Sequence, residues 1–181
     1  MREHQFTLIV DGVDLQDEAP FEALFEAGCD DATVGRVGPV QYLDFDRSAK
    51  SLADAVFSAT EAIESAGVGA RVIHLEPDDL VTMSEIAERT GRTRESVRML
   101  IGGARGPGGF PAPATHFRSR QPMWRWQEVV AWFAEALGEA QKVGPAANAE
   151  FITAFNAGLA WRRVDHRLPE AHRRRLRRLV G

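Results

Sequence analysis

Residues 83–101, MSEIAERTGRTRESVRMLI, decide the expected fold of the middle of the chain. Thr82 and Glu85 have the spacing of a capping box, in which each side chain accepts a hydrogen bond from the other residue's backbone amide. Val81 and Ile86 stand at the positions of a hydrophobic staple around the same helix start. The sequence therefore predicts a firmly capped helix beginning near Met83.

The second half of the stretch predicts another helix after a three-residue turn. Gly91 suits a left-handed helix end, because glycine has no Cβ to clash there. Thr93 is a favourable N-cap, and the apolar residues at helical spacing after it are expected to pack on the first helix: Val97, Leu100 and Ile101. Two helices so joined can place the second in a DNA major groove. Alone, however, these residues equally fit two amphipathic helices that close a core.

Charge is segregated along the 181 residues, although the formal net charge is only −4. Residues 1–79 contain 5 basic and 17 acidic residues, whereas residues 89–126 contain 8 arginines and a single acid, Glu95. Residues 161–181 contain another 8 arginines against 2 acids. Because local charge governs what a surface attracts, the negative total does not exclude a nucleic-acid partner.

Further motifs follow the two helices. They are Phe110-Pro111-Ala112-Pro113, a basic segment His116–Arg120, Trp124-Arg125-Trp126, and Glu128-Val129-Val130-Ala131-Trp132. Together with Ala87, four residues before Gly91, and Val97, six after it, they resemble the MerR-like group, especially the AlpA and excisionase-type winged helix-turn-helix proteins. The resemblance covers residues 80–137, and the link Gly102–Phe110 is longer than the family's. It implies a winged helix-turn-helix domain.

The resemblance also implies a DNA-contacting surface, with the helix Thr93–Ile101 in the major groove and the wing His116–Arg120 on the backbone. The expected contact residues are Arg92, Thr93, Arg94, Ser96, Arg98, His116, Arg118, Ser119 and Arg120. Arginine suits bidentate reading of guanine, and hydroxyl groups near a helix start suit phosphate. Glu95 would accept from a cytosine amino group or stabilise the helix start. The competing interpretation of the arginines is a solvated helix face.

Residues 1–77 predict an α+β domain. The patterns favour strands at 4–10, 32–38, 40–45 and 69–77, and helices at 19–28 and 48–67. In the first helix one face is apolar, with Phe21, Leu24, Phe25 and Ala27. This βαββαβ order is typical of a ferredoxin-like sandwich with both helices on one face. Residues 147–181 predict a helical, arginine-rich tail with an apolar stripe of Phe151, Phe155 and Leu159. The arginines of 173–178 would bind phosphate or dock on the acidic N-terminal domain.

Several functional classes are disfavoured. No run of about 18 apolar residues is present, and the N-terminus turns acidic before a signal-peptide core develops. A lone Cys29 and five scattered histidines indicate neither a disulfide nor a metal site, and the segment Val10–Pro20 reads more readily as a solvated acidic loop than as a cation site. Phosphate-loop, GxSxG and HExxH motifs are absent, so we expect no enzyme and no cofactor.

The sequence therefore predicts a cytoplasmic, bacterial, sequence-specific DNA-binding protein, with transcriptional regulation as its leading role. Its N-terminal domain would sense a ligand or pair with a partner. One alternative is an excision or architectural factor of a mobile element, and another is an antitoxin-like protein-interaction module. A homodimer through the N-terminal domain or the C-terminal helices stays open, and no membrane partner is expected.

Overall fold

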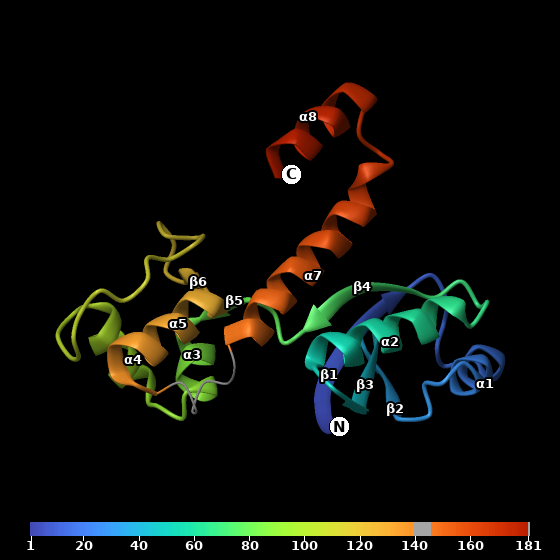
Figure 1. Ribbon diagram of the computed structural model, residues 1–181, viewed down its shortest axis with the longest axis horizontal. Coiled ribbons are helices and arrows are strands. Elements are labelled where there is room, and N and C mark those ends of the chain that lie inside the picture. The colour runs from blue at the N-terminus through green and yellow to red at the C-terminus, as the bar shows by residue number, and fades with distance from the viewer. Residues whose placement is uncertain (140–145, 181) are drawn as a thin grey trace. The chain divides into compact units, whose positions relative to one another are not determined.

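The computed structural model describes residues 1–139 and 146–180, which form a mixed α+β protein (Figure 1). The chain divides into two compact units. The first unit comprises Met1–Pro77 together with the chain from Ala154 onward, and the second comprises Asp78–Thr153. The segment expected as a separate tail from residue 147 instead contributes residues to both units.

The first unit contains a four-stranded antiparallel sheet. Along the chain its elements are β1 (Arg2–Asp11), α1 (Glu18–Glu26), β2 (Ala32–Val37), β3 (Val40–Ala49), α2 (Leu52–Ser65) and β4 (Arg71–Glu76). The strands lie in the order β2-β3-β1-β4, so the first strand is central and the last strand forms one edge. The order of helices and strands is the one predicted, but β3 continues to Ala49, where the start of a helix was expected.

The core of this unit lies between the sheet and its helices. Phe6, Leu8 and Val10 are buried at every second residue of β1, the period at which a strand presents one face. The α2 helix begins after Ser51, whose side chain accepts from the amide of Asp54, and it buries Ala55, Val56, Ala59 and Ile63. The alternation of buried and outward-facing residues along β1 fixes the register of the sheet, because a shift by one residue would expose the buried side chains.

The α1 helix differs from the sequence prediction. Its expected inner face included Phe21 and Phe25, but these side chains are 49% and 57% exposed, and Leu24 is the helix residue that is buried. A nine-residue helix can press only a narrow line of side chains against a sheet, and here that line passes through Leu24. The prediction for Phe21 and Phe25 was therefore wrong.

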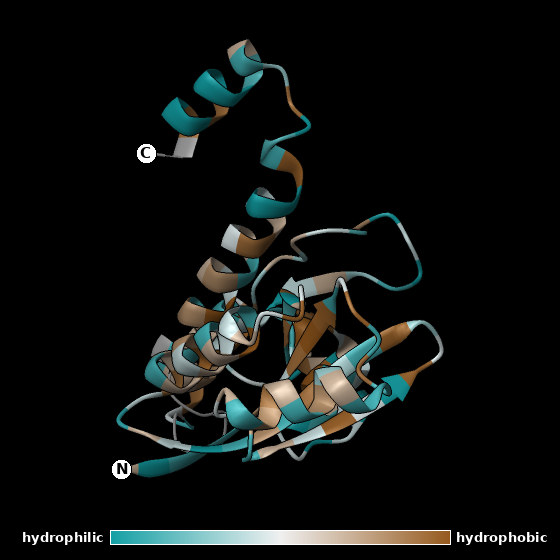
Figure 2. Ribbon diagram, turned by 90° about the vertical axis from the view of Figure 1, so that its right-hand side faces the viewer, coloured by the Kyte–Doolittle hydropathy of each residue, from teal (hydrophilic) through white to brown (hydrophobic). Residues whose placement is uncertain are grey.

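The C-terminal part of α7 (Ala146–Asp165) packs beside β4 in the first unit (Figure 1). Asn156 hydrogen-bonds to the backbone of Leu75, and Phe155 makes an edge-to-face contact with Phe57 of α2 at 5.7 Å between ring centroids. After a turn, α8 (Glu170–Val180) completes the chain as a mostly hydrophilic helix (Figure 2). Arg173 and Arg177 of α8 pair with Asp165.

The second unit consists of short strands and helices around a separate core. Its elements are β5 (Leu80–Thr82), α3 (Met83–Arg89), α4 (Arg94–Ile101), β6 (Met123–Arg125) and α5 (Trp126–Leu137). β5, a three-residue strand that the sequence pattern did not predict, pairs antiparallel with β6. The first turns of α7 also belong here, with Ala149 in the core. None of the described helices is long and apolar enough to cross a membrane.

Candidate nucleic-acid interface

The start of α3 is held by the predicted capping box. The amide of Glu85 donates to Thr82 Oγ1 at 3.3 Å, and the amide of Thr82 donates to Glu85 Oε2 at 2.7 Å. Val81 and Ile86 are fully buried on either side of this cap. The cap joins β5 to α3 without a loop, so the strand fixes the direction in which the helix leaves.

A tight turn then aims α4 away from α3. Gly91 has φ of 62°, the left-handed conformation expected of it. Thr93 Oγ1 accepts from the amide of Ser96 at 3.1 Å, which makes Thr93 the predicted N-cap of α4. Val97 and Leu100 are buried against the core. Because these residues define the inner face, the opposite face of α4 presents Arg94, Glu95 and Arg98 to solvent.

The segment His116–Arg120 forms an exposed loop between two extended pieces of backbone. Thr115 bridges Met123 of β6 at its base, and the amide of Ser119 donates to the carbonyl of His116 at 2.8 Å. All five side chains are exposed, and the Arg118 guanidinium lies 5.4 Å from the ring centroid of Phe117. The loop is therefore a short hairpin tip that carries two exposed arginines, Arg118 and Arg120.

Indole groups anchor the irregular link that separates α4 from this loop. Trp132 Nε1 donates to the carbonyl of Gly108 at 3.0 Å, and Trp124 Nε1 donates to that of Pro111 at 3.1 Å. Phe110 packs on Trp132 with ring centroids 4.9 Å apart. The link is thus tied to the core near its C-terminal end, and both tryptophans are core side chains.

Asp79 is a structural residue that the sequence did not reveal. It is 5% exposed, its Oδ2 accepts from Arg125 at 3.1 Å, and its Oδ1 accepts from the amide of Gln127 at 3.3 Å. It lies at the N-terminus of α5, where a carboxylate is favoured by the helix dipole. Asp79 therefore joins the start of β5 to β6 and to the first turn of α5.

The eight arginines of residues 89–126 fall into two groups. Arg92, Arg98 and Arg125 form ion pairs with Glu139, Glu95 and Asp79, respectively. Arg89 donates to the carbonyl of Asp78 and lies over the ring of Trp126. The other four arginines of residues 89–126 are exposed and have no ion pair with a carboxylate among the described residues: Arg94, Arg105, Arg118 and Arg120.

Arg92 differs from the other residues expected at DNA. Its guanidinium donates to both carboxylate oxygens of Glu139, at 2.9 and 2.8 Å, and lies 5.4 Å from the ring centroid of Phe133. Its side chain is 21% exposed. The charge of Arg92 is neutralised within the unit, so this residue belongs to the packing of the domain rather than to its solvent-facing cations.

Arg98 is exposed but is also paired. Its guanidinium donates to both oxygens of Glu95, at 2.9 and 2.6 Å, one helical turn away. The hydrogen bond from Arg98 lowers the pKa of the Glu95 carboxyl, and the same bond raises the pKa of Arg98. Both charges are present at neutral pH, and Glu95 partly offsets the positive face of α4.

Other kinds of site find little support in the described part of the chain. No three His, Cys, Asp or Glu side chains there lie close enough together to hold a metal ion. Cys29 is buried, and burial, opposed by Arg47, raises the pKa of its thiol to about 11.

Comparisons with protein-family models, with curated proteins and with solved structures found no match to this chain.

Proposed function

We propose that the chain is a sequence-specific DNA-binding protein, acting as a transcriptional regulator through a winged helix-turn-helix formed by the second unit. In this proposal α4 enters the major groove and the loop His116–Arg120 is the wing. The first unit is a ferredoxin-like sandwich that senses a ligand or a partner. Its element order and its strand order, β2-β3-β1-β4, support that assignment.

One observation carries the proposal. Arg94, at the first position of α4, and Arg118 and Arg120, on the loop, are exposed and lack a carboxylate partner among the described residues. The other helix and strand arginines of the segment are bound inside the unit or to Glu95. Apart from Arg105 of the link, the cations of this segment that stay unneutralised lie at the helix start and at the hairpin tip, the two positions from which a winged helix-turn-helix would contact a duplex.

The chemistry of these positions matches duplex DNA. The fork of an arginine reads guanine O6 and N7 in the major groove, and Arg94 lies at the end of α4 that a recognition helix inserts first. A hairpin arginine can reach phosphate or the adjacent minor groove. Each neutralised phosphate releases counterions, so log affinity should fall with log salt by roughly 0.9 per phosphate contacted.

The test has two parts. Selection of bound sequences from a randomised duplex pool asks whether a motif is enriched. Fluorescence anisotropy on the selected duplex then gives the salt dependence. Arg94→Ala should weaken binding and flatten preference at one or two base pairs, while Arg118→Ala with Arg120→Ala should reduce the salt slope by roughly 1 to 2.

Arg36→Ala is the matched control, because it removes one exposed arginine, paired with Asp14, from the first unit. It should leave both the motif and the slope unchanged. The proposal is overturned if no duplex is bound at low salt, or if Arg94→Ala, folded as judged by circular dichroism, binds the selected duplex as the unaltered protein does.

A further inference from the structure

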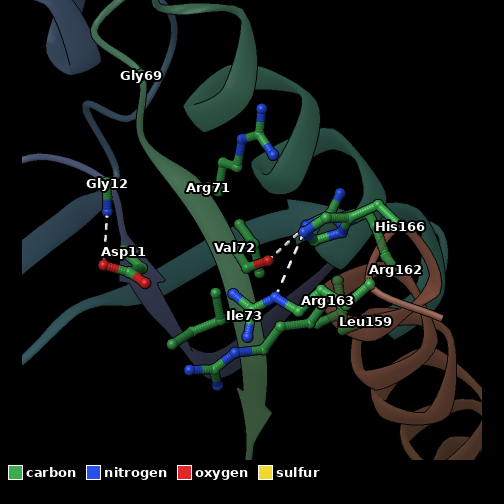
Figure 3. Close-up of a pocket in the computed structure, with 11 residues that line it drawn as sticks. Asp11, Gly12, Gly69, Arg71, Val72, Ile73, Leu159, Arg162, Arg163 and His166 are labelled. Atoms are coloured by element: carbon green, nitrogen blue, oxygen red, sulfur yellow. Dashed lines mark hydrogen bonds between the residues drawn. The ribbon is translucent and has the colours of Figure 1, made fainter.

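We infer that the first unit binds a small molecule carrying two or more phosphate groups, in a cavity between β4 and the C-terminal end of α7 (Figure 3). The cavity measures about 330 Å³. Basic side chains line it from both elements and from the turn after α7: Arg71, Arg162, Arg163, His166 and Arg167. This site belongs to the unit proposed to sense a ligand and does not include α4 or the wing.

The charge around the cavity is positive even after its acids are counted. Its four arginines face Asp11 in the wall and Glu64 behind Arg162, which leaves an excess of 4 − 2 = 2 positive charges without His166. A positive site is unexpected here, because residues 1–79 are mostly acidic. Three of the four arginines that line the cavity come instead from residues 162–167. The fold brings these cations to β4.

The arginines of the cavity differ in whether a carboxylate holds them. Arg162 donates to both oxygens of Glu64, at 3.0 and 2.8 Å, and to the carbonyl of Val72, so its position is set by the sheet. Arg71 and Arg163 have no ion pair with any carboxylate among the described residues, and Arg167 donates to the ring of His166 at 3.4 Å. Planar guanidinium groups left in this state suit bidentate contacts with phosphate oxygens.

Two acidic residues near the cavity, Asp11 and Asp165, accept hydrogen bonds or ion pairs from groups other than the cavity arginines. Asp11 Oδ1 accepts from the amide of Gly12 at 2.8 Å. Asp165, the residue before His166, accepts ion pairs from Arg173 and Arg177 of α8 and does not line the cavity. An anion entering the cavity therefore meets Arg71 and Arg163, which have no carboxylate partner among the described residues, while Asp165 is held by α8 and Asp11 is the carboxylate left in the lining.

The floor of the cavity is formed by two loops in close approach. A Cβ on Gly12 would lie 2.4 Å from the carbonyl oxygen of Gly69, and both glycines have positive φ, 99° and 83°. A neighbouring hollow of about 500 Å³ shares Gly69, Arg71 and Arg162 with the first. The combined space accommodates a ligand with more than one charged group, and concave sites of this size are typical of small molecules.

Isothermal titration calorimetry on the full chain tests the inference, with pyrophosphate as the probe. Titration with inorganic phosphate shows whether two phosphate groups are needed. Titration with citrate shows whether a ligand with several carboxylates binds equally well. Sodium chloride at matched ionic strength shows whether the signal comes only from screening of the arginine charges. We expect saturable binding of pyrophosphate with a stoichiometry of one, and at least tenfold weaker binding of citrate and of single phosphate.

Arg163→Gln with Arg167→Gln should weaken pyrophosphate binding at least tenfold without changing the melting temperature of the unliganded protein, because neither side chain forms an ion pair with the residues that the structure describes. Arg36→Ala should bind as the unaltered protein, and Arg94→Ala, which tests DNA binding, should also bind pyrophosphate normally. Equal binding by the double variant, or an effect reproduced by sodium chloride, overturns the inference. The inference is also overturned if the unaltered protein does not bind pyrophosphate and the double variant loses duplex binding. The arginines would then contact DNA.

Discussion

The side-chain amide of Asn156 forms both hydrogen bonds that the backbone of Leu75 offers, accepting from its N–H at 2.8 Å and donating to its carbonyl at 2.9 Å. Leu75 lies in β4, the edge strand of the sheet. Val72 on the same edge is bound in a similar way, its amide by Glu64 and its carbonyl by Arg162. Side chains therefore satisfy backbone groups that would otherwise be open to another strand.

Asn156→Ala should destabilise the first unit. It leaves an N–H and a carbonyl of a half-buried edge without partners, which costs roughly 1–3 kcal/mol of unfolding free energy. Asn148→Ala is the matched control, since it makes the same exchange on the same helix and Asn148 forms no side-chain hydrogen bond to the described residues. Urea unfolding followed by circular dichroism measures both. Equal losses in the two variants would show that the Asn156 bonds do not stabilise the edge.

Glu95→Gln should strengthen DNA binding if the proposed function holds. The substitution removes a negative charge from the exposed face of α4 and frees Arg98, so the salt slope should steepen by roughly 0.9. Glu135→Gln is a suitable control, because Glu135 is exposed on α5 of the same unit. Anisotropy titrations at several salt concentrations give the slopes. Weaker binding with altered sequence preference would instead indicate that the Glu95 carboxylate itself accepts from a base.

Arg92→Ala should affect stability and leave DNA recognition alone. The variant loses a bidentate bond to Glu139 and the contact with Phe133, a change worth roughly 1–2 kcal/mol for a partly buried pair. Its salt slope for DNA should match that of the unaltered protein at temperatures where both are folded. Arg94→Ala should show the reverse pattern, with a normal melting temperature, weaker binding and a relaxed sequence preference. A reduced slope for Arg92→Ala would place its guanidinium at the phosphates.

Cys29 should react slowly with thiol reagents in the folded protein. Burial raises its pKa to about 11, so roughly one thiol in a thousand is ionised at pH 8. Because the unfolded thiol loses its proton from about pH 9, the unfolded state binds fewer protons above that pH. Stability should therefore fall between pH 9 and pH 11. Cys29→Ser should lessen that fall. Labelling with a chromogenic disulfide, with and without urea, measures the reactivity, and similar rates in both conditions would contradict a buried thiol.

The features that the sequence predicted well are local. Thr82 with Glu85, and Thr93 with Ser96, are three residues apart, and the chemistry of such caps is determined by neighbouring residues alone. Alternation in β1 likewise indicated its buried face. The three-residue strand β5 carries too few residues for any periodicity, and it exists because β6, more than 40 residues later, pairs with it.

What the sequence could not show depends on long-range pairing. Arg92 and Glu139 are 47 residues apart, and Leu75 and Asn156 are 81 apart. Nothing in the local pattern distinguishes Arg92, which is packed, from Arg94, which is exposed, since both lie in one basic run. The cavity at β4 was missed for the same reason, because its arginines are separated by most of the chain. The sequence feature that could have indicated this cavity was the excess of arginine after residue 161.

The insertion of residues 78–153 into the first unit has a consequence for biosynthesis. A ribosome releases the strands of the sheet early, yet α7, whose C-terminal part protects β4, follows the whole middle segment, so nascent chains carry an unprotected strand edge throughout translation of that segment. The second unit is one continuous segment and can acquire its structure before the first unit is complete. Chains truncated before Asn156 should therefore be prone to self-association through β4, a tendency that the contacts from α7 remove.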